Sequence, residues 1–239
     1  TLNQALLKHY YGIQHWGLPP GFLTPPIPGR VDMLLYLADL LGKTKKPVRV
    51  LDVGTGANCI YPLVGTKLLG WQFVGSEIHP ASIDWAKKLV QENHLERQIE
   101  LRLQPEAKSI FKNVIRAGEK FDLSICNPPF FANRAEAEAE GARKWKHLGL
   151  GLKGSHRNFG GEAHELWCTG GEPQFLARMA TESSQFAKSV RWFSSLVSKA
   201  AHLKAFDRAL EKAGATEMHI IDMQQGQKKS RVVAWTFTE

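Results

Sequence analysis

From residue 48 onward, short apolar runs rich in β-branched residues alternate with longer amphipathic stretches. This alternation is typical of a mostly parallel sheet with helices packed on both faces. It predicts strands over residues 48–53, 71–77, 99–103, 121–126, 190–196, 218–222 and 231–238. The last two runs have no helical stretch between them, so they should form an antiparallel hairpin through residues 223–230. We therefore expect an α/β, doubly wound, seven-stranded sheet that ends in an antiparallel C-terminal hairpin strand.

The stretches between these runs, and the N-terminal part of the chain, show the spacing of amphipathic helices. Helices are predicted over residues 2–11, 31–42, 60–69, 80–93, 109–117, 173–188 and 200–213. Residues 17–29 contain five prolines, which favour an extended segment. Residues 1–47 thus form a helical and proline-rich extension ahead of a domain at 48–239, in which residues 131–172 are an irregular, basic insertion.

Composition limits the classes of protein that fit. The 239 residues, 43% of them hydrophobic, suit one globular domain, and no apolar run is long enough to cross a bilayer. The net charge of +8 favours a polyanionic partner. The three cysteines lack metal-ligand spacing, so we expect no metal and a reducing, cytoplasmic location.

A glycine-rich turn follows the first predicted strand. It contains Gly54 and Gly56, with Asp52 at the strand end and Asn58 where dinucleotide-binding turns have a third glycine. The Asp52 carboxylate would repel a phosphate, so the turn suits a cationic ligand without phosphate, such as S-adenosyl-L-methionine. A tight turn that binds no ligand has the same pattern.

An acidic residue, Glu77, ends the second predicted strand, 25 residues after Asp52. A carboxylate at this position can accept hydrogen bonds from both ribose hydroxyls of an adenosine. The alternative is a carboxylate that only stabilises the start of the next helix. Together with the glycine-rich turn, the spacing favours the cofactor.

The fourth predicted strand ends in Asn127, Pro128, Pro129 and Phe130. The exocyclic amine of adenine is a poor nucleophile because its lone pair is delocalised into the ring. The Asn127 side-chain oxygen and the Pro128 carbonyl are acceptors that can oppose this delocalisation. Phe130 offers a ring on which a base can stack, and the prolines keep the loop rigid.

These three motifs resemble those of class I, S-adenosylmethionine-dependent amino-methyltransferases, which have a Rossmann-like fold. A more specific resemblance, to the bacterial RlmF family, covers nearly the whole chain. It is carried by residues 25–30 (PPIPGR), 56–62 (GANCIYP), 158–161 (NFGG), 165–168 (ELWC) and 226–231 (GQKKSR). The resemblance implies methylation of N6 of one adenine in 23S rRNA. It also implies that Arg30 reaches the methionine carboxylate of the cofactor.

The insertion concentrates cations beside the expected base pocket. The residues expected to contact RNA are Arg143, Lys144, Lys146, Lys153 and Arg157, with Lys228 and Lys229 at the hairpin tip. Excess cations next to a pocket for a splayed-out base indicate an RNA-gripping loop. A solvated, charged loop has the same composition.

Several alternatives stay open from the sequence. A protein glutamine-N5 methyltransferase uses the same Asn-Pro-Pro-aromatic chemistry on an amide, and an adenine-N6 methyltransferase can act on another RNA or on DNA. A non-catalytic RNA-binding protein with an inherited fold is the remaining option. The favoured partner is large-subunit rRNA or a ribosome assembly intermediate, bound by a monomer without membrane attachment.

Overall fold

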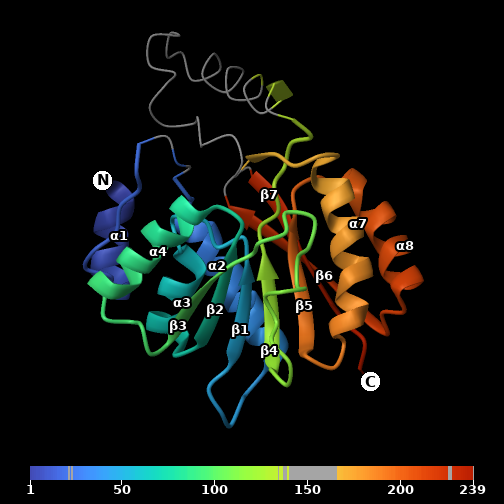
Figure 1. The fold of residues 1–239 in the computed structure, drawn as a ribbon, viewed down its shortest axis with the longest axis horizontal. Helices are drawn as coiled ribbons and strands as arrows, with labels where there is room; N and C mark the ends of the chain where they lie inside the picture. The colour runs from blue at the N-terminus through green and yellow to red at the C-terminus, as the bar shows by residue number, and fades with distance from the viewer. Residues whose placement is uncertain are drawn as a thin grey trace.

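A single seven-stranded sheet organises the computed structural model, which describes residues 1–20, 22, 24–133, 135–136, 139, 166–225 and 228–238. The strand order is β3-β2-β1-β4-β5-β7-β6 (Figure 1). The strands are β1 (Arg49–Val53), β2 (Gln72–Glu77), β3 (Ile99–Leu103), β4 (Phe121–Cys126), β5 (Val190–Val197), β6 (Glu217–Gln225) and β7 (Lys228–Thr236). The predicted α/β fold is confirmed.

The first five strands run parallel, and β7 pairs antiparallel with both β5 and β6. The hairpin strands are longer than the sequence predicted, because their ladder continues to the pair Gln225 and Lys228. The hairpin tip therefore lies at the edge where the parallel strands end. The C-terminus lies at the opposite edge (Figure 1).

Helices cover both faces of the sheet (Figure 1). One face packs against α1 (Leu2–Tyr11), α2 (Ile27–Leu41), α3 (Ile60–Leu69) and α4 (Pro80–Glu92), and the other against α7 (Gly171–Ser183) and α8 (Leu203–Ala213). Consecutive residues of β1 pack into the two cores, because side chains alternate between the faces of a sheet. Val50 packs with the first set of helices and Leu51 with the second. No helix in the described part of the chain is long and apolar enough to span a membrane.

The N-terminal extension is integrated into the first core. Leu7, Ile13 and Trp16 are buried with residues of α2, α3 and the sheet. The Trp16 indole N–H donates to the Asn58 carbonyl at 2.9 Å, so this segment also supports the turn after β1. The extension therefore positions the start of α3.

Helix α2 begins four residues earlier than the start at residue 31 that the sequence pattern predicts. The helix begins at Ile27, inside the segment that its prolines marked as extended, and Pro28 lies in the first turn. Proline is tolerated there because the first-turn N–H groups have no helical acceptor. The earlier start puts Arg30 inside the helix, with only 9% of its surface exposed.

The helix predicted over residues 109–117 does not form. The backbone N–H groups of Ile110, Phe111 and Lys112 instead donate to the carboxylate of Glu182 on α7, at 2.7 to 3.1 Å. Asn113 then adopts a positive φ of 68°, which a right-handed helix does not allow. A tertiary carboxylate has thus replaced the local helical hydrogen bonds.

Helix α3 packs against β2 so closely that Gly65→Ala should destabilise the protein. A Cβ at Gly65 would lie 2.4 Å from the Phe73 ring. Alanine normally stabilises a helix interior by roughly 0.5–1 kcal/mol relative to glycine. Overpacking costs about 1–3 kcal/mol, so urea unfolding should show a net loss of about 1–2 kcal/mol. The double variant Gly65→Ala/Phe73→Leu should lose less stability than the summed losses of the two single variants, because the smaller side chain relieves the clash. Losses that simply add would contradict the steric explanation.

Candidate functional site

The predicted site residues come together at the carboxyl ends of three neighbouring strands. β1 delivers Asp52 and Gly54, β2 delivers Glu77 and β4 delivers Asn127. In the parallel register, Val53 of β1 pairs with Ser76 of β2 and with Cys126 of β4. The chain builds the sheet outward from β1 through β2 to β3 and then returns to place β4 on the other side. Ligands of open α/β sheets bind at such a reversal.

The glycine-rich turn folds over the end of β2. The N–H groups of Gly54 and Thr55 both donate to the Ser76 carbonyl at 2.9 Å. Gly54 and Gly56 have positive φ values of 72° and 60°, which glycine adopts without the Cβ clash of other residues. Gly75 is required for packing, since a Cβ there would lie 3.1 Å from the Thr55 hydroxyl. The turn is therefore held close against β2.

The Glu77 carboxylate joins the two strand ends. Its Oε2 accepts from the Gly56 N–H at 3.1 Å, and its Oε1 accepts from the N–H groups of Ile78 and His79 at 2.7 and 3.1 Å. Only 8% of the residue is exposed. Three backbone donors thus fix the orientation of a buried carboxylate at the mouth of the turn.

Asp52 is a buried carboxylate without a hydrogen-bond partner in the part of the chain that the structure describes. Both oxygens are inaccessible, and the residue is 1% exposed. Burial raises the pKa of Asp52 to about 7, although the nearby Thr55 hydroxyl and, after it, the positive charge of Arg30 oppose this rise. An unpartnered buried carboxylate is costly, so its presence fits a ligand that brings hydrogen-bond donors or positive charge.

Arg30 lies in the same region and is supported by Tyr61 of α3. Its Nη1 donates to the Tyr61 hydroxyl at 2.8 Å, and that hydroxyl lies 3.1 Å from the Met33 sulfur. Burial raises the pKa of Tyr61, and the Arg30 charge opposes this rise. Since a guanidinium has five donors, one bond to Tyr61 orients Arg30 without exhausting its capacity.

Asn58 has a local structural role. Its side-chain oxygen accepts from the Ile60 N–H at 3.1 Å, and Cys59 between them adopts a φ of 48°. This Asx-type turn starts α3. The residue that replaces the third glycine of a dinucleotide motif thus shapes the turn through its own side chain.

The loop after β4 carries a further unpartnered oxygen. Asn127 Oδ1 is buried and has no hydrogen-bond partner in the described part of the chain. Pro128 is buried, while Pro129 and Phe130 are half-buried, and Phe130 packs against the first core. The acceptor thus lies on a loop fixed by proline and by core packing.

Residues 166–168, which the sequence analysis quoted without assigning them a function, hold this loop in place. The N–H groups of Phe130 and Phe131 both donate to the Leu166 carbonyl at 3.0 Å, and the Cys168 N–H donates to the Phe131 carbonyl at 3.0 Å. Phe131 and Trp167 form an isolated parallel bridge. Because this pairing uses backbone groups on both sides of the insertion, the identity of the side chains could not predict it.

Part of the predicted RNA-binding surface consists of residues that the structure does not describe. Arg143, Lys144, Lys146, Lys153 and Arg157 fall outside the described residues. Lys228 and Lys229 begin β7, but only their backbone is described. Among described residues, no group of three or more His, Cys, Asp or Glu side chains could hold a metal ion.

Comparison with known proteins agrees with this geometry. Residues 1–239 match the family described as RNA methyltransferase. The ribosomal RNA large subunit methyltransferase F of Pseudomonas fluorescens is 49% identical over 99% of this chain and 73% of its own length. The protein of the same name from Desulfotalea psychrophila is 50% identical over 100% of this chain and 80% of its own length.

Solved structures give the same assignment. The hMettl16 catalytic domain in complex with the MAT2A 3′UTR hairpin 1 superposes with a TM-score of 0.84 at 32% identity, covering 100% of this chain and 79% of that one. The N-terminal domain of human METTL16 in complex with SAH superposes with a TM-score of 0.77 at 25% identity, covering 100% and 81%.

The buried Asp52 makes stability depend on pH when no ligand is bound. Its folded pKa of about 7 exceeds the ordinary value of 3.8, so between these values the folded state binds more protons than the unfolded state. Its contribution to the free energy of unfolding therefore falls as pH rises from about 4 to 7. Asp52→Asn lacks this titration, so its free energy of unfolding should rise by about 2–4 kcal/mol relative to that of the wild type over this range. Urea unfolding of both proteins at pH 4.5 and pH 8 tests this. A difference in free energy of unfolding between the two proteins that is the same at both pH values would contradict the raised pKa.

Proposed function

Because this chain belongs to the RNA methyltransferase family, we propose that it methylates N6 of one adenine in 23S rRNA. Its cofactor is S-adenosyl-L-methionine, which supplies an electrophilic methyl group on a sulfonium centre. The names of its relatives from Pseudomonas fluorescens and Desulfotalea psychrophila support large-subunit rRNA as the substrate. The chemistry of the Asn127 loop supports an exocyclic amine as the acceptor group.

The residues at the ends of β1 and β2 fit this cofactor. Glu77 is oriented to accept from ribose hydroxyls, and Arg30 offers a guanidinium fork to the methionine carboxylate. Gly54 and Gly56 let the backbone approach closely, and Asn58 shapes the turn. The unpartnered Asp52 carboxylate supplies negative charge where the cofactor brings a cation.

The residues after β4 hold the substrate amine. The Asn127 oxygen and the Pro128 carbonyl accept its N–H groups, which opposes delocalisation of the nitrogen lone pair into the ring. Phe130 stacks on the base, which contributes about 1–3 kcal/mol to its binding. Pro128 and Pro129 limit the reorganisation that the loop undergoes, so the amine is held in position for attack.

One observation carries this proposal. Within the described residues, Asn127 Oδ1 is a buried acceptor without a partner, located at the end of β4 next to the strand that bears Asp52. A structural asparagine would have its oxygen satisfied by the surrounding protein. An oxygen left unsatisfied beside the expected cofactor site needs a donor from a ligand, and an amine that is to be methylated supplies one.

The basic residues of the insertion and of the hairpin extend this site toward RNA. Arg143, Lys144, Lys146, Lys153 and Arg157 follow the Asn127 loop in the chain, and Lys228 and Lys229 begin β7 at the same edge of the sheet. We assign them contacts with the phosphate backbone of 23S rRNA, either free or in an assembly intermediate. We also propose that the protein acts as a monomer in the cytoplasm and needs no metal, since the described residues contain no group of His, Cys, Asp or Glu side chains that could hold one.

Asn127→Ala should abolish methylation while cofactor binding survives, because the change removes only an acceptor for the amine. Loss of one such preorganised contact lowers kcat by about a hundredfold or more. Activity is measured with labelled S-adenosylmethionine and 23S rRNA, followed by mass mapping of the methylated nucleotide. Cofactor affinity from calorimetry is the control, and retained methylation would contradict the mechanism.

The same assay separates the alternatives when a release factor and DNA are included beside the rRNA. Label in the release factor and none in RNA would identify a protein glutamine methyltransferase, which uses the same loop chemistry. Label that DNase releases and RNase does not would identify a DNA enzyme. RNase-sensitive label that mapping places at N6 of adenine is the expected result.

Arg30→Lys should weaken S-adenosylmethionine binding about tenfold, because an ammonium cannot form the two parallel bonds of a guanidinium with a carboxylate. Tyr61→Phe is the matched control, since it removes the support of Arg30 but keeps the guanidinium. The control should lose less affinity than Arg30→Lys. Equal affinities of Arg30→Lys and the wild type in calorimetry would remove Arg30 from the cofactor site.

A further inference from the structure

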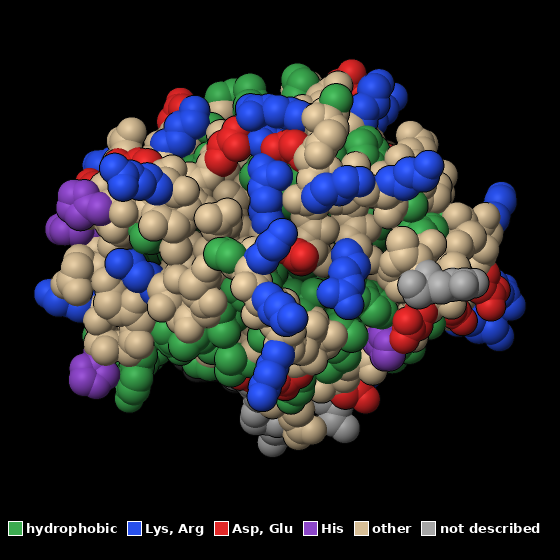
Figure 2. Space-filling view, turned by 90° about the horizontal axis from the view of Figure 1, so that it is seen from below, with side chains coloured by type: hydrophobic (Ala, Val, Ile, Leu, Met, Phe, Trp, Pro, Cys, Tyr) green, Lys and Arg blue, Asp and Glu red, His purple; other side chains and the backbone are tan. Residues whose placement is uncertain are grey.

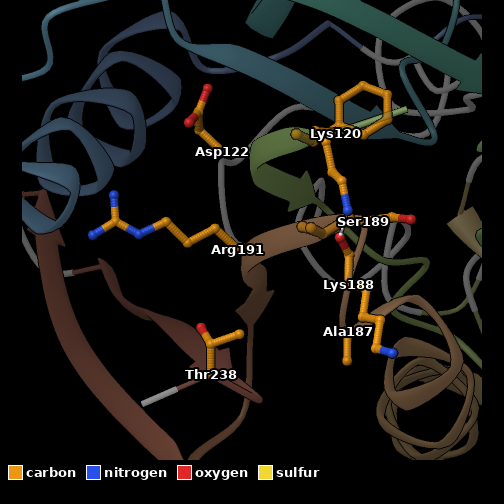
Figure 3. A pocket seen from close by; sticks show the side chains of 9 residues that line it. Lys120, Asp122, Ala187, Lys188, Ser189, Arg191 and Thr238 are labelled. Carbon is orange, nitrogen blue, oxygen red and sulfur yellow. Dashed lines mark hydrogen bonds between the residues drawn. The ribbon is translucent and has the colours of Figure 1, made fainter. Parts of the chain in front are cut away.

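A basic hollow lies at the edge of the sheet opposite the candidate site. It is formed at the amino ends of β4 and β5 and has a volume of about 440 Å³. Its polar lining consists of Lys120, Asp122, Lys188, Ser189, Arg191 and Thr238 (Figure 3). Since β4 and β5 run parallel, this edge is separated from the Asn127 loop by the full length of the strands. The mechanism makes no use of it.

Backbone hydrogen bonds fix the walls of the hollow. The Phe121 N–H donates to the Ser189 carbonyl at 2.7 Å, and the Ser189 N–H donates to the Phe186 carbonyl at 2.8 Å. On the other side, the Thr236 hydroxyl donates to the Arg191 carbonyl at 2.7 Å. The cations therefore project from a preformed concave surface, which lowers the entropic cost of binding a ligand there.

The hollow carries an excess of positive charge. Within the described residues, Lys120, Lys188 and Arg191 have no carboxylate partner at ion-pair distance. Lys120 Nζ donates to the Lys188 carbonyl, which orients the ammonium without neutralising it. The carboxylate of Asp122 also faces the hollow, and it accepts from the Arg49 N–H at 2.8 Å. Among the described lining residues, three cations face one anion, which favours an anionic ligand.

The surrounding face is basic as well. Lys and Arg side chains gather across the face seen from below in Figure 2. Lys43, Lys45 and Lys46 are exposed in the loop before β1, whose amino end neighbours that of β4. By contrast, Arg49 and Arg102 in this half of the molecule are each paired with Glu119 at 2.7 Å, and Arg102 is also paired with Glu100 at 2.7 Å. The cations of the hollow and the three lysines of the loop before β1 thus lie on one face.

We propose that this hollow binds backbone phosphates of an RNA whose target adenine occupies the site at the other edge. The inference rests on the proposed RNA substrate. Lys and Arg side chains around a concavity bind phosphates without reading sequence. β4 alone spans six residues, roughly 20 Å. An RNA segment must therefore continue well beyond the target base to reach the hollow. The contact selects for long or folded RNA over short fragments.

The test uses the full chain in which Lys120, Lys188 and Arg191 are all changed to Gln. Its affinity for a full-length 23S rRNA transcript should fall about tenfold or more, with the slope of log K against log salt reduced by about 2–3. Affinity for S-adenosylmethionine should not change. Fluorescence anisotropy across a salt series measures the affinity for rRNA, and calorimetry measures the affinity for the cofactor.

The matched control changes Lys8 on α1 and Lys204 and Arg208 on α8 to Gln, which removes the same charge elsewhere. Within the described residues, none of the three has a carboxylate partner at ion-pair distance. An equal loss of rRNA affinity in the control, or an unchanged salt slope in the hollow variant, overturns the proposal. If the triple variant does not fold, the exposed Lys188→Gln alone should still lower the slope by about 1. Failure to methylate rRNA would refute the proposed function instead, because the salt slope reports on binding without any turnover.

Discussion

The fold depends on the Glu77 carboxylate, which joins the glycine-rich turn after β1 to the end of β2 through three backbone N–H donors. The turn has two positive-φ glycines and would otherwise have many conformations. Because a buried carboxylate with backbone donors is favourable only in one geometry, it selects one shape for the turn. The same side chain is the one proposed to accept from the ribose, so the residue that shapes the pocket is also part of its lining.

Three buried oxygens without a hydrogen-bond partner in the described residues lie near this junction, two on Asp52 of β1 and one on Asn127 directly after β4. Asp52 and Asn127 are buried with acceptors that nothing in the described protein satisfies, which costs folding free energy. The cores on both faces of the sheet offset that cost. Such local conflicts between stability and structure concentrate at functional sites. In the proposed function, donors from the cofactor and the substrate complete this hydrogen bonding, and the free energy recovered on their binding contributes to affinity.

The order of elements was predictable because burial on both faces requires strands and helices to alternate in the sequence. The bounds of α3 follow from its flanking turn residues in the same way. The segment at 109–117 was not predictable, because Glu182, about seventy residues away, accepts the hydrogen bonds that a local helix would have used. The site residues on β1, β2 and β4 carried recognisable chemistry. Their support by Tyr61 and by the Leu166 carbonyl depends on tertiary contacts that no local pattern records.

A parallel sheet has two chemically different edges, and this chain uses both. At the carboxyl edge, strand ends and following loops converge on reactive groups. At the amino edge, the turns that enter the strands place Lys120 and Lys188 around a hollow. A small RNA reaches only the first edge, whereas a large folded RNA can reach both. Because phosphate contacts carry no base information, the second edge adds affinity for any RNA that reaches it from the first edge, whatever its sequence. Recognition of the adenine then remains with the Asn127 loop, and the amino edge separates a large RNA from the many short RNAs that contain the same base.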